Sequence, residues 1–247
     1  MTKTPENNFN ELGLELGFTV PDWKPARLPD SSILQGQHCR LEPLNIDAHS
    51  AELFESYSTD EENRIWVYLP YGPFANLGEF QKWMADACFT GDPYFYAIID
   101  KKREKATGMA SYLRITPEQG CIEVGHINYS PLLQNTVAAT ETMYLMMKNA
   151  FDLGNRRYEW KCNALNAKSC NAARRLGFTY EGTFRQMLVV KGQNRDSAWF
   201  SLLDREWPVI RTAFETWLSE DNFDAEGMQK RSLSDLTRTA LASLEDN

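Results

Sequence analysis

The sequence predicts a mixed α/β fold of the α+β kind, on three observations. Short runs rich in β-branched and aromatic residues recur along the chain, and amphipathic patterns of helical period separate them. Three of these runs follow one another through short turns, as in a meander. Because strands and helices are interspersed without a regular alternation, we expect one sheet with helices packed against it.

The first elements lie ahead of residue 90. The run QHCRLEPLN (37–45) alternates like a strand. DAHSAELFESYS (47–58) follows with a helical pattern, and Asp47 is its expected N-cap. The turn YLPYGPF (68–74), rich in Pro and Gly, separates this helix from a second one at NLGEFQKWMADACF (76–89).

The meander follows at residues 94–130. Its three strands are expected at YFYAIID (94–100), TGMASYLRI (107–115) and CIEVGHINYS (121–130). The charged turn KKREKA joins the first two runs, and the Gly-containing turn PEQG leads into the third.

Helices and strands alternate in the second half of the chain. Residues 138–153 predict a helix capped by Gly154, and NAKSCNAARRLGF predicts another with Gly177 just past its end. RYEWKCNA (157–164) is strand-like and lies between these helices. YEGTFRQMLVVKG and RDSAWFSLLD predict a hairpin that turns at Gln193 and Asn194, and EWPVIRTAFETWL predicts a helix.

The chain divides into three segments. Residues 1–36 form an irregular, Pro-containing arm, residues 37–219 the main domain, and residues 220–247 a polar tail that can hold a short amphipathic helix at SLSDLTRTALASL.

Composition narrows the class of function. The 247 residues are 43% hydrophobic and 24% charged, which is typical of a globular protein, and the net charge is −8. An acidic chain is a poor candidate for binding nucleic acid through a broad basic surface. No apolar run is long enough for a membrane span and the N-terminus has no apolar signal core, so a cytoplasmic location with no membrane partner is expected.

Cysteine and histidine usage points to neither disulfides nor metal. The five cysteines are an odd number without a Cys-x-x-Cys pair, and the three histidines are scattered. We therefore expect reduced, packed thiols and no metal site.

The order of the elements and several motifs resemble the GCN5-related N-acetyltransferase (GNAT) superfamily over residues 37–205. The stretch IEVGHINYSPLLQNTVAATE resembles its fourth strand and pyrophosphate loop. LNAKSCNAARRLGF resembles its next helix, where Asn166, Ser169 and the terminal Leu176-Gly177-Phe178 match. The EVGH and YEG motifs are similar to those of the ribosomal-protein N-acetyltransferase branch. The resemblance implies a mostly antiparallel central sheet flanked by helices.

The resemblance also implies acetyl-CoA as cosubstrate. Its pyrophosphate would lie on the backbone N–H groups at the start of the helix that follows Pro131. The loop lacks the usual glycines, so a plain helix start is the alternative. The cofactor-binding residues implied are Ile127, Asn128, Gln134, Asn135, Thr136, Val137, Ala138, Ala139, Asn166 and Ser169. Lys168, Arg174 or Arg175 could meet the 3′-phosphate, or form a solvated helix face.

Transfer of acetyl to an amine needs a proton acceptor, because a charged amine is not a nucleophile. Glu123 is the candidate base, with His126 or water as alternatives. Strict strand alternation would place Glu123 on one face and His126 on the other. Ser169 is the candidate group that serves the leaving sulfur, since Ala173 stands where many relatives carry a tyrosine acid.

The acceptor is expected to be an amine-bearing peptide or small molecule, and the protein a monomer or homodimer. Aromatic residues of the 66–74 segment would form the acceptor wall or ordinary core: Trp66, Tyr68, Tyr71 and Phe74. Trp160 and Trp199 are expected in the core. The other functions compatible with the sequence are an acyl-CoA-binding regulatory module without turnover and a non-catalytic interaction protein.

Overall fold

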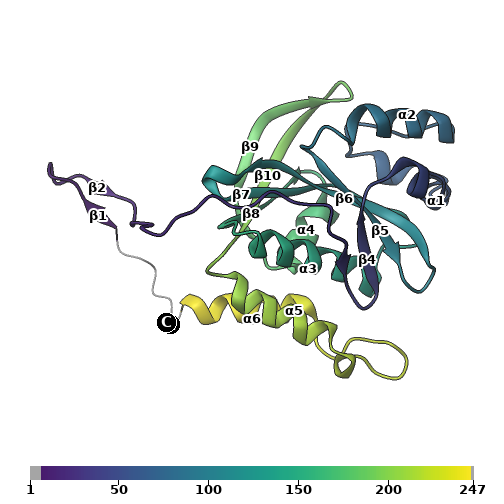
Figure 1. Ribbon diagram of the computed structural model, residues 1–247. Coiled ribbons are helices and arrows are strands. Elements are labelled where there is room, and N and C mark those ends of the chain that lie inside the picture. Colours follow the sequence, from purple (N-terminus) through teal and green to yellow (C-terminus); the bar gives the residue numbers. More distant parts are fainter. Residues whose placement is uncertain (1–6, 246–247) are drawn as a thin grey trace.

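The computed structural model describes residues 7–245 and contains an eight-stranded sheet in the order β3-β4-β5-β6-β7-β8-β10-β9 (Figure 1). All neighbouring strands in it are antiparallel except β7 and β8. The predicted mixed, mostly antiparallel sheet is thus confirmed. Its strands are β3 (Leu34–Gln35), β4 (Cys39–Pro43), β5 (Tyr94–Asp100), β6 (Lys105–Thr116), β7 (Cys121–Tyr129), β8 (Arg157–Asn163), β9 (Thr179–Val190) and β10 (Gln193–Leu203).

Helices cover the two faces of the sheet unequally. The α-helices are α1 (Ile46–Ser58), α2 (Leu77–Ala87), α3 (Val137–Asp152), α4 (Ala167–Arg175), α5 (Trp207–Leu218) and α6 (Leu233–Glu245). Helices α1 and α2 share one hydrophobic cluster with β5 and β6, whereas α3 to α6 share the larger cluster on the other face. None of the described helices therefore covers the α1/α2 face of β7, β8, β10 and β9.

Helix starts follow the local capping chemistry. Asn45, not Asp47, is the N-cap of α1, and its side chain accepts a hydrogen bond from the Ala48 N–H at 2.9 Å. The prediction of Asp47 was wrong: this residue lies in the first turn, where its charge favours the helix dipole. The cap of α2 is Asn76, which binds the Glu79 N–H at 3.0 Å.

The β9–β10 hairpin turns two residues earlier than predicted. The turn consists of Lys191 and Gly192, both in the left-handed region with φ of 49° and 75°. Two consecutive positive φ values are those of a type I′ turn, whose twist matches the strands. Gln193 and Asn194 instead begin β10.

A buried carboxylate fastens α3 to the start of β4. Glu141 accepts hydrogen bonds from the N–H groups of Gln37 and His38, each at 2.7 Å, and of Cys39 at 2.8 Å. Three donors on one buried carboxylate fix the helix against the sheet just after the turn that begins α3.

The terminal segments differ in how they pack. Strands β1 (Asn8–Phe9) and β2 (Glu15–Leu16) form an exposed hairpin that projects from the domain (Figure 1). The predicted helix of the tail is present as α6, and its residues Leu233 and Leu236 are buried in the main core. Residues 1–6 of the predicted arm and 246–247 of the predicted tail lie outside the described residues.

Three short 3₁₀ turns complete the structure: η1 (Arg64–Trp66), η2 (Pro117–Gln119) and η3 (Glu220–Asn222). Within residues 7–245, none of the helices is long and apolar enough to cross a membrane. In the same range no cluster of His, Cys, Asp and Glu could hold a metal ion, and all five cysteines are free.

Candidate active site

The two parallel strands at the centre of the sheet separate halfway along their length. Pairing of β7 with β8 runs from Cys121–Arg157 to Val124–Trp160 and then stops. Beyond Val124, the backbone of β7 that faces β8 has no partner strand among residues 7–245. The separation leaves a gap between the strands that is flanked by the loop before α3 and by the start of α4.

A β-bulge in β7 lies beside this gap. Met109 and Ser111 of β6 pair with Asn128 and Gly125, so two residues of β7 oppose one of β6. His126, with φ of 49°, is one of these two residues, and Ile127 is the other. The bulge reverses the alternation that the sequence predicts and turns the His126 side chain to the α1/α2 side, where it stacks on Tyr71. Glu123 and His126 thus lie on the same side of the sheet, and the predicted opposite placement was wrong.

The loop before α3 presents free amides. Thr136 is the N-cap, and its hydroxyl accepts a hydrogen bond from the Ala139 N–H at 3.1 Å. Within residues 7–245, no hydrogen-bond acceptor contacts the N–H groups of the four preceding residues, 135–138. Free amides at a helix N-terminus form an anion site.

The missing glycines have a local explanation. Asn135 adopts a left-handed conformation with φ of 60°, which glycine favours and which asparagine tolerates better than other side chains. Gln134 donates from its side chain to the Tyr129 carbonyl at 2.8 Å and so ties the loop to the end of β7. Val137 and Ala139 are half-buried and Ala138 is buried.

The remaining predicted residues of β7 have different surroundings. Ile127 packs against the larger hydrophobic cluster under α3. Asn128 is paired with Met109 of the α1/α2 cluster, and its side chain lies on the same side as that residue. The Asn128 side chain is 1% exposed, and within the described range neither of its amide atoms has a hydrogen-bond partner.

The start of α4 brings Asn166 and Ser169 together on the other side of the gap. Asn166 is the N-cap, and its side chain accepts from the Ser169 N–H at 3.1 Å. The Ser169 hydroxyl accepts from Trp160 Nε1 at 3.1 Å, which leaves its own proton to donate. Ala173 is fully buried, so a tyrosine at this position would have to displace neighbouring core side chains.

The cations of α4 are divided between packing and solvent. Arg175 donates to the Thr140 hydroxyl at 3.1 Å and lies over the Trp217 ring. The Arg174 guanidinium carbon is 5.4 Å from the centre of the Phe200 ring, and Lys168 is exposed. Arg174 is exposed as well, so Lys168 and Arg174 are the two cations of α4 that a phosphate can reach.

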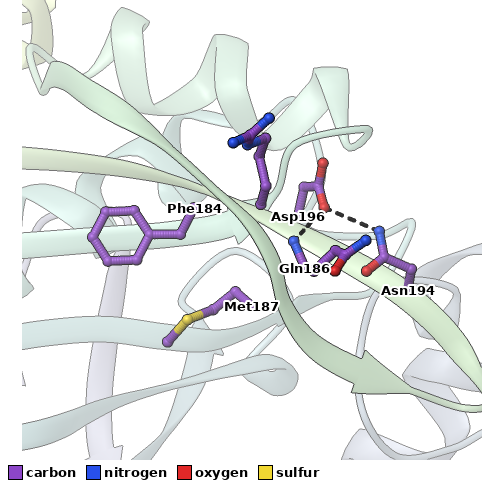
Figure 2. A pocket seen from close by; sticks show the side chains of 6 residues that line it. Phe184, Gln186, Met187, Asn194 and Asp196 are labelled. Carbon is purple, nitrogen blue, oxygen red and sulfur yellow. Dashed lines mark hydrogen bonds between the residues drawn. The ribbon is translucent and has the colours of Figure 1, made fainter.

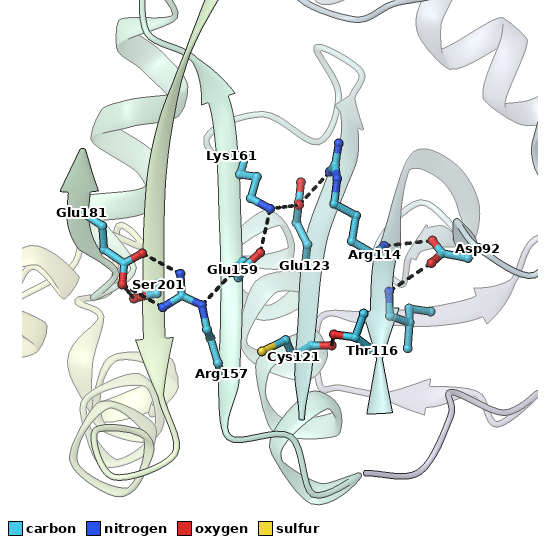
Figure 3. Close-up of polar contacts among 11 residues, drawn as sticks. Asp92, Arg114, Thr116, Cys121, Glu123, Arg157, Glu159, Lys161, Glu181 and Ser201 are labelled. Carbon is cyan, nitrogen blue, oxygen red and sulfur yellow. Dashed lines mark hydrogen bonds and ion pairs between the residues drawn. The ribbon is translucent and has the colours of Figure 1, made fainter. Parts of the chain in front are cut away.

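Glu123 is the second member, after Arg114, of a row of charges across the open face (Figure 3). Its Oε2 is 2.7 Å from Arg114 Nη1 and 2.9 Å from Lys161 Nζ. Its Oε1 has no hydrogen-bond partner in the described part of the chain and lies 3.7 Å from the position that a Cβ on Gly125 would occupy. Burial raises the pKa of Glu123, and the two cations oppose this effect.

The row continues through β8 to β9. Lys161 also binds Glu159 at 2.7 Å, Arg157 binds Glu159 at 2.6 Å, and Glu181 contacts Arg157 at 2.5 Å (Figure 3). Each of these carboxylates thus has a cation on a neighbouring position of the sheet.

His126 is the second titratable group beside the gap. Its Nδ1 lies 3.2 Å from the Tyr71 hydroxyl. Burial lowers the pKa of His126 to about 4, helped by the charges of Arg114 and Arg195. The imidazole is therefore neutral at neutral pH but weakly basic.

The aromatic residues of the 66–74 segment line the same side. Trp66 is buried, Tyr71 and Phe74 are half-buried, and Tyr68 is 38% exposed, with its hydroxyl 3.3 Å from the Leu165 carbonyl. Trp160 lies in the core, as predicted. Trp199 is only half-buried: it stacks on Phe184 and carries Lys161 Nζ 3.6 Å from its ring centre. Its predicted place in the core was wrong, because it projects from the opposite face.

The β9–β10 hairpin closes the open side. Lys191 Nζ, at the turn, donates to the carbonyls of Trp66 at 2.9 Å and Gly72 at 2.7 Å. The hairpin also carries a surface pocket (Figure 2), in which Asp196 accepts from the Gln186 N–H and from the Asn194 side chain. The other lining residues are Phe184, Arg185 and Met187.

Sequence reasoning missed three cations: Arg114, Lys161 and Arg195. Each belongs to a different strand, and their meeting depends on which strands are neighbours. The sequence signal that was available is the alternation of RYEWKCN. It places Arg157, Glu159 and Lys161 on one face of the strand, opposite the buried Tyr158, Trp160 and Cys162.

Comparisons with known proteins identify the family of the chain. Residues 38–179 match the family model described as acetyltransferase (GNAT) domain. The chain is similar to the crystal structure of a GCN5-related N-acetyltransferase from Brucella melitensis, with 44% identity and a TM-score of 0.86 over 89% of this chain and 100% of that one. It is 25% identical over 171 residues to the uncharacterized N-acetyltransferase p20 of Bacillus licheniformis, which covers 68% of this chain and 95% of that protein.

A more distant structure shares the fold. This is RimL, the ribosomal L7/L12 alpha-N-protein acetyltransferase, solved in complex with coenzyme A. It is 19% identical, with a TM-score of 0.58 over 70% of this chain and 98% of that one.

Proposed function

The chain belongs to the GNAT acetyltransferases and is an acetyl-CoA-dependent N-acetyltransferase, and we propose that it acetylates a primary amine at the gap between β7 and β8. The resemblance seen in the sequence motifs is thereby confirmed at the level of the family. The acceptor and the roles of individual residues belong to the proposal.

The observation that carries the proposal is the placement of two complementary features, one on β7 and one just after it. Strand β7 leads into four consecutive free N–H groups at residues 135–138, which suit a pyrophosphate. The same strand carries Glu123, whose Oε1 has no partner in residues 7–245. Coenzyme A in the RimL structure supports the assignment of the ligand.

The thioester would lie in the gap, between the bulge of β7 and the start of α4. Backbone N–H groups of β7 that face the gap can stabilise the oxyanion, because β8 no longer pairs with them. Ser169 has a hydroxyl proton to donate to the leaving sulfur. Asn166 positions Ser169 by capping the helix through its N–H.

The acceptor amine would approach from the α1/α2 side, where Glu123 and His126 both lie. Glu123 Oε1 takes the proton, directly or through water. Its raised pKa makes it a stronger base than an ordinary carboxylate. His126, with a pKa of about 4 and a hydrogen bond to Tyr71, is better suited to shape the acceptor wall.

The experiment is a calorimetric titration with CoA followed by a screen of amines for CoA release from acetyl-CoA. We expect CoA binding and release that depends on an amine. Absence of CoA binding at millimolar ligand would contradict the proposal and favour an interaction protein. Binding without turnover on any amine would favour a regulatory module. Val137, in place of a loop glycine, and Ala173, in place of the tyrosine acid, are the residues that favour this alternative.

A further inference from the structure

Arg195 of β10 is a partly buried cation whose side chain has no partner in the described part of the chain. Its Nε is buried with no hydrogen-bond partner, and within residues 7–245 no carboxylate pairs with its guanidinium. The side chain as a whole keeps intermediate exposure, so a ligand can reach it. A buried donor and an unpaired charge both carry a free-energy cost, which a bound anion would remove.

The anchors of the hairpin place Arg195 over the gap. On one side, Ser197 pairs with Asn163 at the end of β8, and the Asp196 carbonyl accepts from the Ala164 N–H at 2.8 Å. On the other side, Lys191 at the turn is fixed to the carbonyls of Trp66 and Gly72.

Arg195 lies between these two anchors, on the part of the hairpin that extends beyond β8. The segment 66–72 to which the turn is fixed contacts β7 through Tyr71 and His126. This part of the hairpin therefore crosses from β8 to the side of β7, and the buried Nε shows that the side chain points inward.

The charges around Arg195 are already matched among themselves. Arg114 and Lys161 share Glu123, Lys161 and Arg157 share Glu159, and Arg157 also binds Glu181. That row holds three cations and three carboxylates, and Arg195 is the additional cation. The charge of Arg195 lowers the pKa of His126, and the charge of Glu123 opposes the burial that lowers the pKa of Arg195. Both directions agree with a position of Arg195 beside the row.

From this geometry we infer that Arg195 binds an anionic group of the acceptor, so that the substrate is a primary amine that carries a carboxylate near the amine. A simple polyamine would place a second cation beside Arg195 and be repelled. The chemistry fits a free amino acid or a peptide whose first residue is acidic. This inference rests on the proposed function and names the acceptor class for the same site.

The test uses pairs of acceptors with nearly the same shape, of which only one member carries the carboxylate, and compares them at equal concentrations of the free amine. L-amino acids are compared with their α-carboxamides, and Asp-Ala amide is compared with Asn-Ala amide. Steady-state constants are measured for the native protein and for Arg195→Gln, Arg195→Lys and Arg185→Gln. Arg185 lines the exposed pocket of the same hairpin, so its variant is the matched control.

We expect the native protein to prefer the charged member of at least one pair by about tenfold or more. Arg195→Gln should remove the preference by raising KM for the charged acceptor, with little effect on the neutral one. Arg195→Lys should restore part of it, and Arg185→Gln should leave it intact. A preference for the amino acid over its α-carboxamide would identify a free amino acid as the acceptor. A preference for Asp-Ala amide over Asn-Ala amide would identify a peptide whose first residue is acidic.

Three results would overturn the inference. They are equal use of both members of every pair, a loss of kcat in Arg195→Gln that is the same for all acceptors, and a loss of CoA affinity in that variant. If CoA binds but no amine is acetylated, the proposed function fails instead. Calorimetry of the same acceptor pairs with the CoA-bound protein then decides the inference, since only an anion site binds the charged members more tightly.

Discussion

Glu123 and Lys161 lie on neighbouring parallel strands with Oε2 and Nζ 2.9 Å apart. They flank the last pair before the strands separate, Val124 and Trp160: Glu123 is one residue before it on β7 and Lys161 one residue beyond it on β8. The lysine side chain is 9% exposed and the glutamate side chain 3%. Because Arg114 contacts the same oxygen, both cations act on one side of the carboxylate and leave Oε1 available. This arrangement has measurable consequences for pH dependence.

Removing either cation should move the acid limb of the kcat/KM profile to higher pH. Lys161 and Arg114 favour the ionised form of Glu123, so their loss raises its pKa further, and the base is then protonated at a higher pH. We expect a shift of about one unit or more for Lys161→Met. Arg114→Gln should shift it less, because Arg114 is 55% exposed and water screens it. An unchanged acid limb in Lys161→Met would show that Glu123 does not control the rate.

The cradle for the pyrophosphate can be tested at Val137, the first residue of α3. Val137→Gly removes a Cβ near the free amides and should keep or tighten CoA affinity, although it weakens the helix slightly. Val137→Asp places a negative charge at the same point and should weaken binding sharply by repulsion of phosphate. Calorimetry with CoA measures both, and equal affinities would mean that this loop does not hold the phosphates.

His126 should make stability depend on pH. Its pKa is about 4 in the folded protein and about 6.5 in an unfolded chain, so the unfolded state takes up the proton first as the pH falls. The contribution of His126 is complete above pH ~6.5 and is lost progressively towards pH 4, by about 3 kcal/mol in total (2.5 units at 1.36 kcal/mol). Urea unfolding between pH 7.5 and 4.5 measures this change.

The control for this prediction is His126→Asn, because asparagine tolerates the positive φ at this position. Its free energy of unfolding should fall less steeply over the same interval. Parallel pH curves for the native protein and the variant would contradict the assigned titration.

The elements of the fold could be predicted because their periodicity is strong. Strand β5, for example, is predicted and observed at the same seven residues, YFYAIID. The exact residue at which a helix or a turn begins was predicted wrongly where neighbouring residues carry similar signals. Asn45 and Asp47 are both good helix caps, and the turn at Lys191 needs a positive φ that lysine rarely adopts.

The positions of the candidate site residues could be predicted only where one continuous segment holds them. The loop 134–139 and the pair Asn166 and Ser169 are each continuous in sequence, and their positions follow from helix starts. The bulge at His126 depends on how β7 registers with β6, which no local pattern of β7 reveals. Arg114, Lys161 and Arg195 come from three strands that are far apart in the chain, and they lie near one another only because of the strand order in the sheet.

The central claim is that Glu123 accepts the proton of the amine. The most direct test is the pH dependence of kcat/KM for Glu123→Gln, with Glu159→Gln as the matched control from the same row of charges. Lys161 keeps Glu159 as a partner at 2.7 Å in the first variant, and denaturation confirms that both variants are folded at the assay temperature. We predict a fall of about 10²–10⁴-fold near pH 7 for Glu123→Gln, recovering as the pH rises and free amine becomes abundant, and a much smaller change for Glu159→Gln. Full activity of Glu123→Gln from about pH 6 to 9, the range over which a general base controls the supply of free amine, would contradict the account.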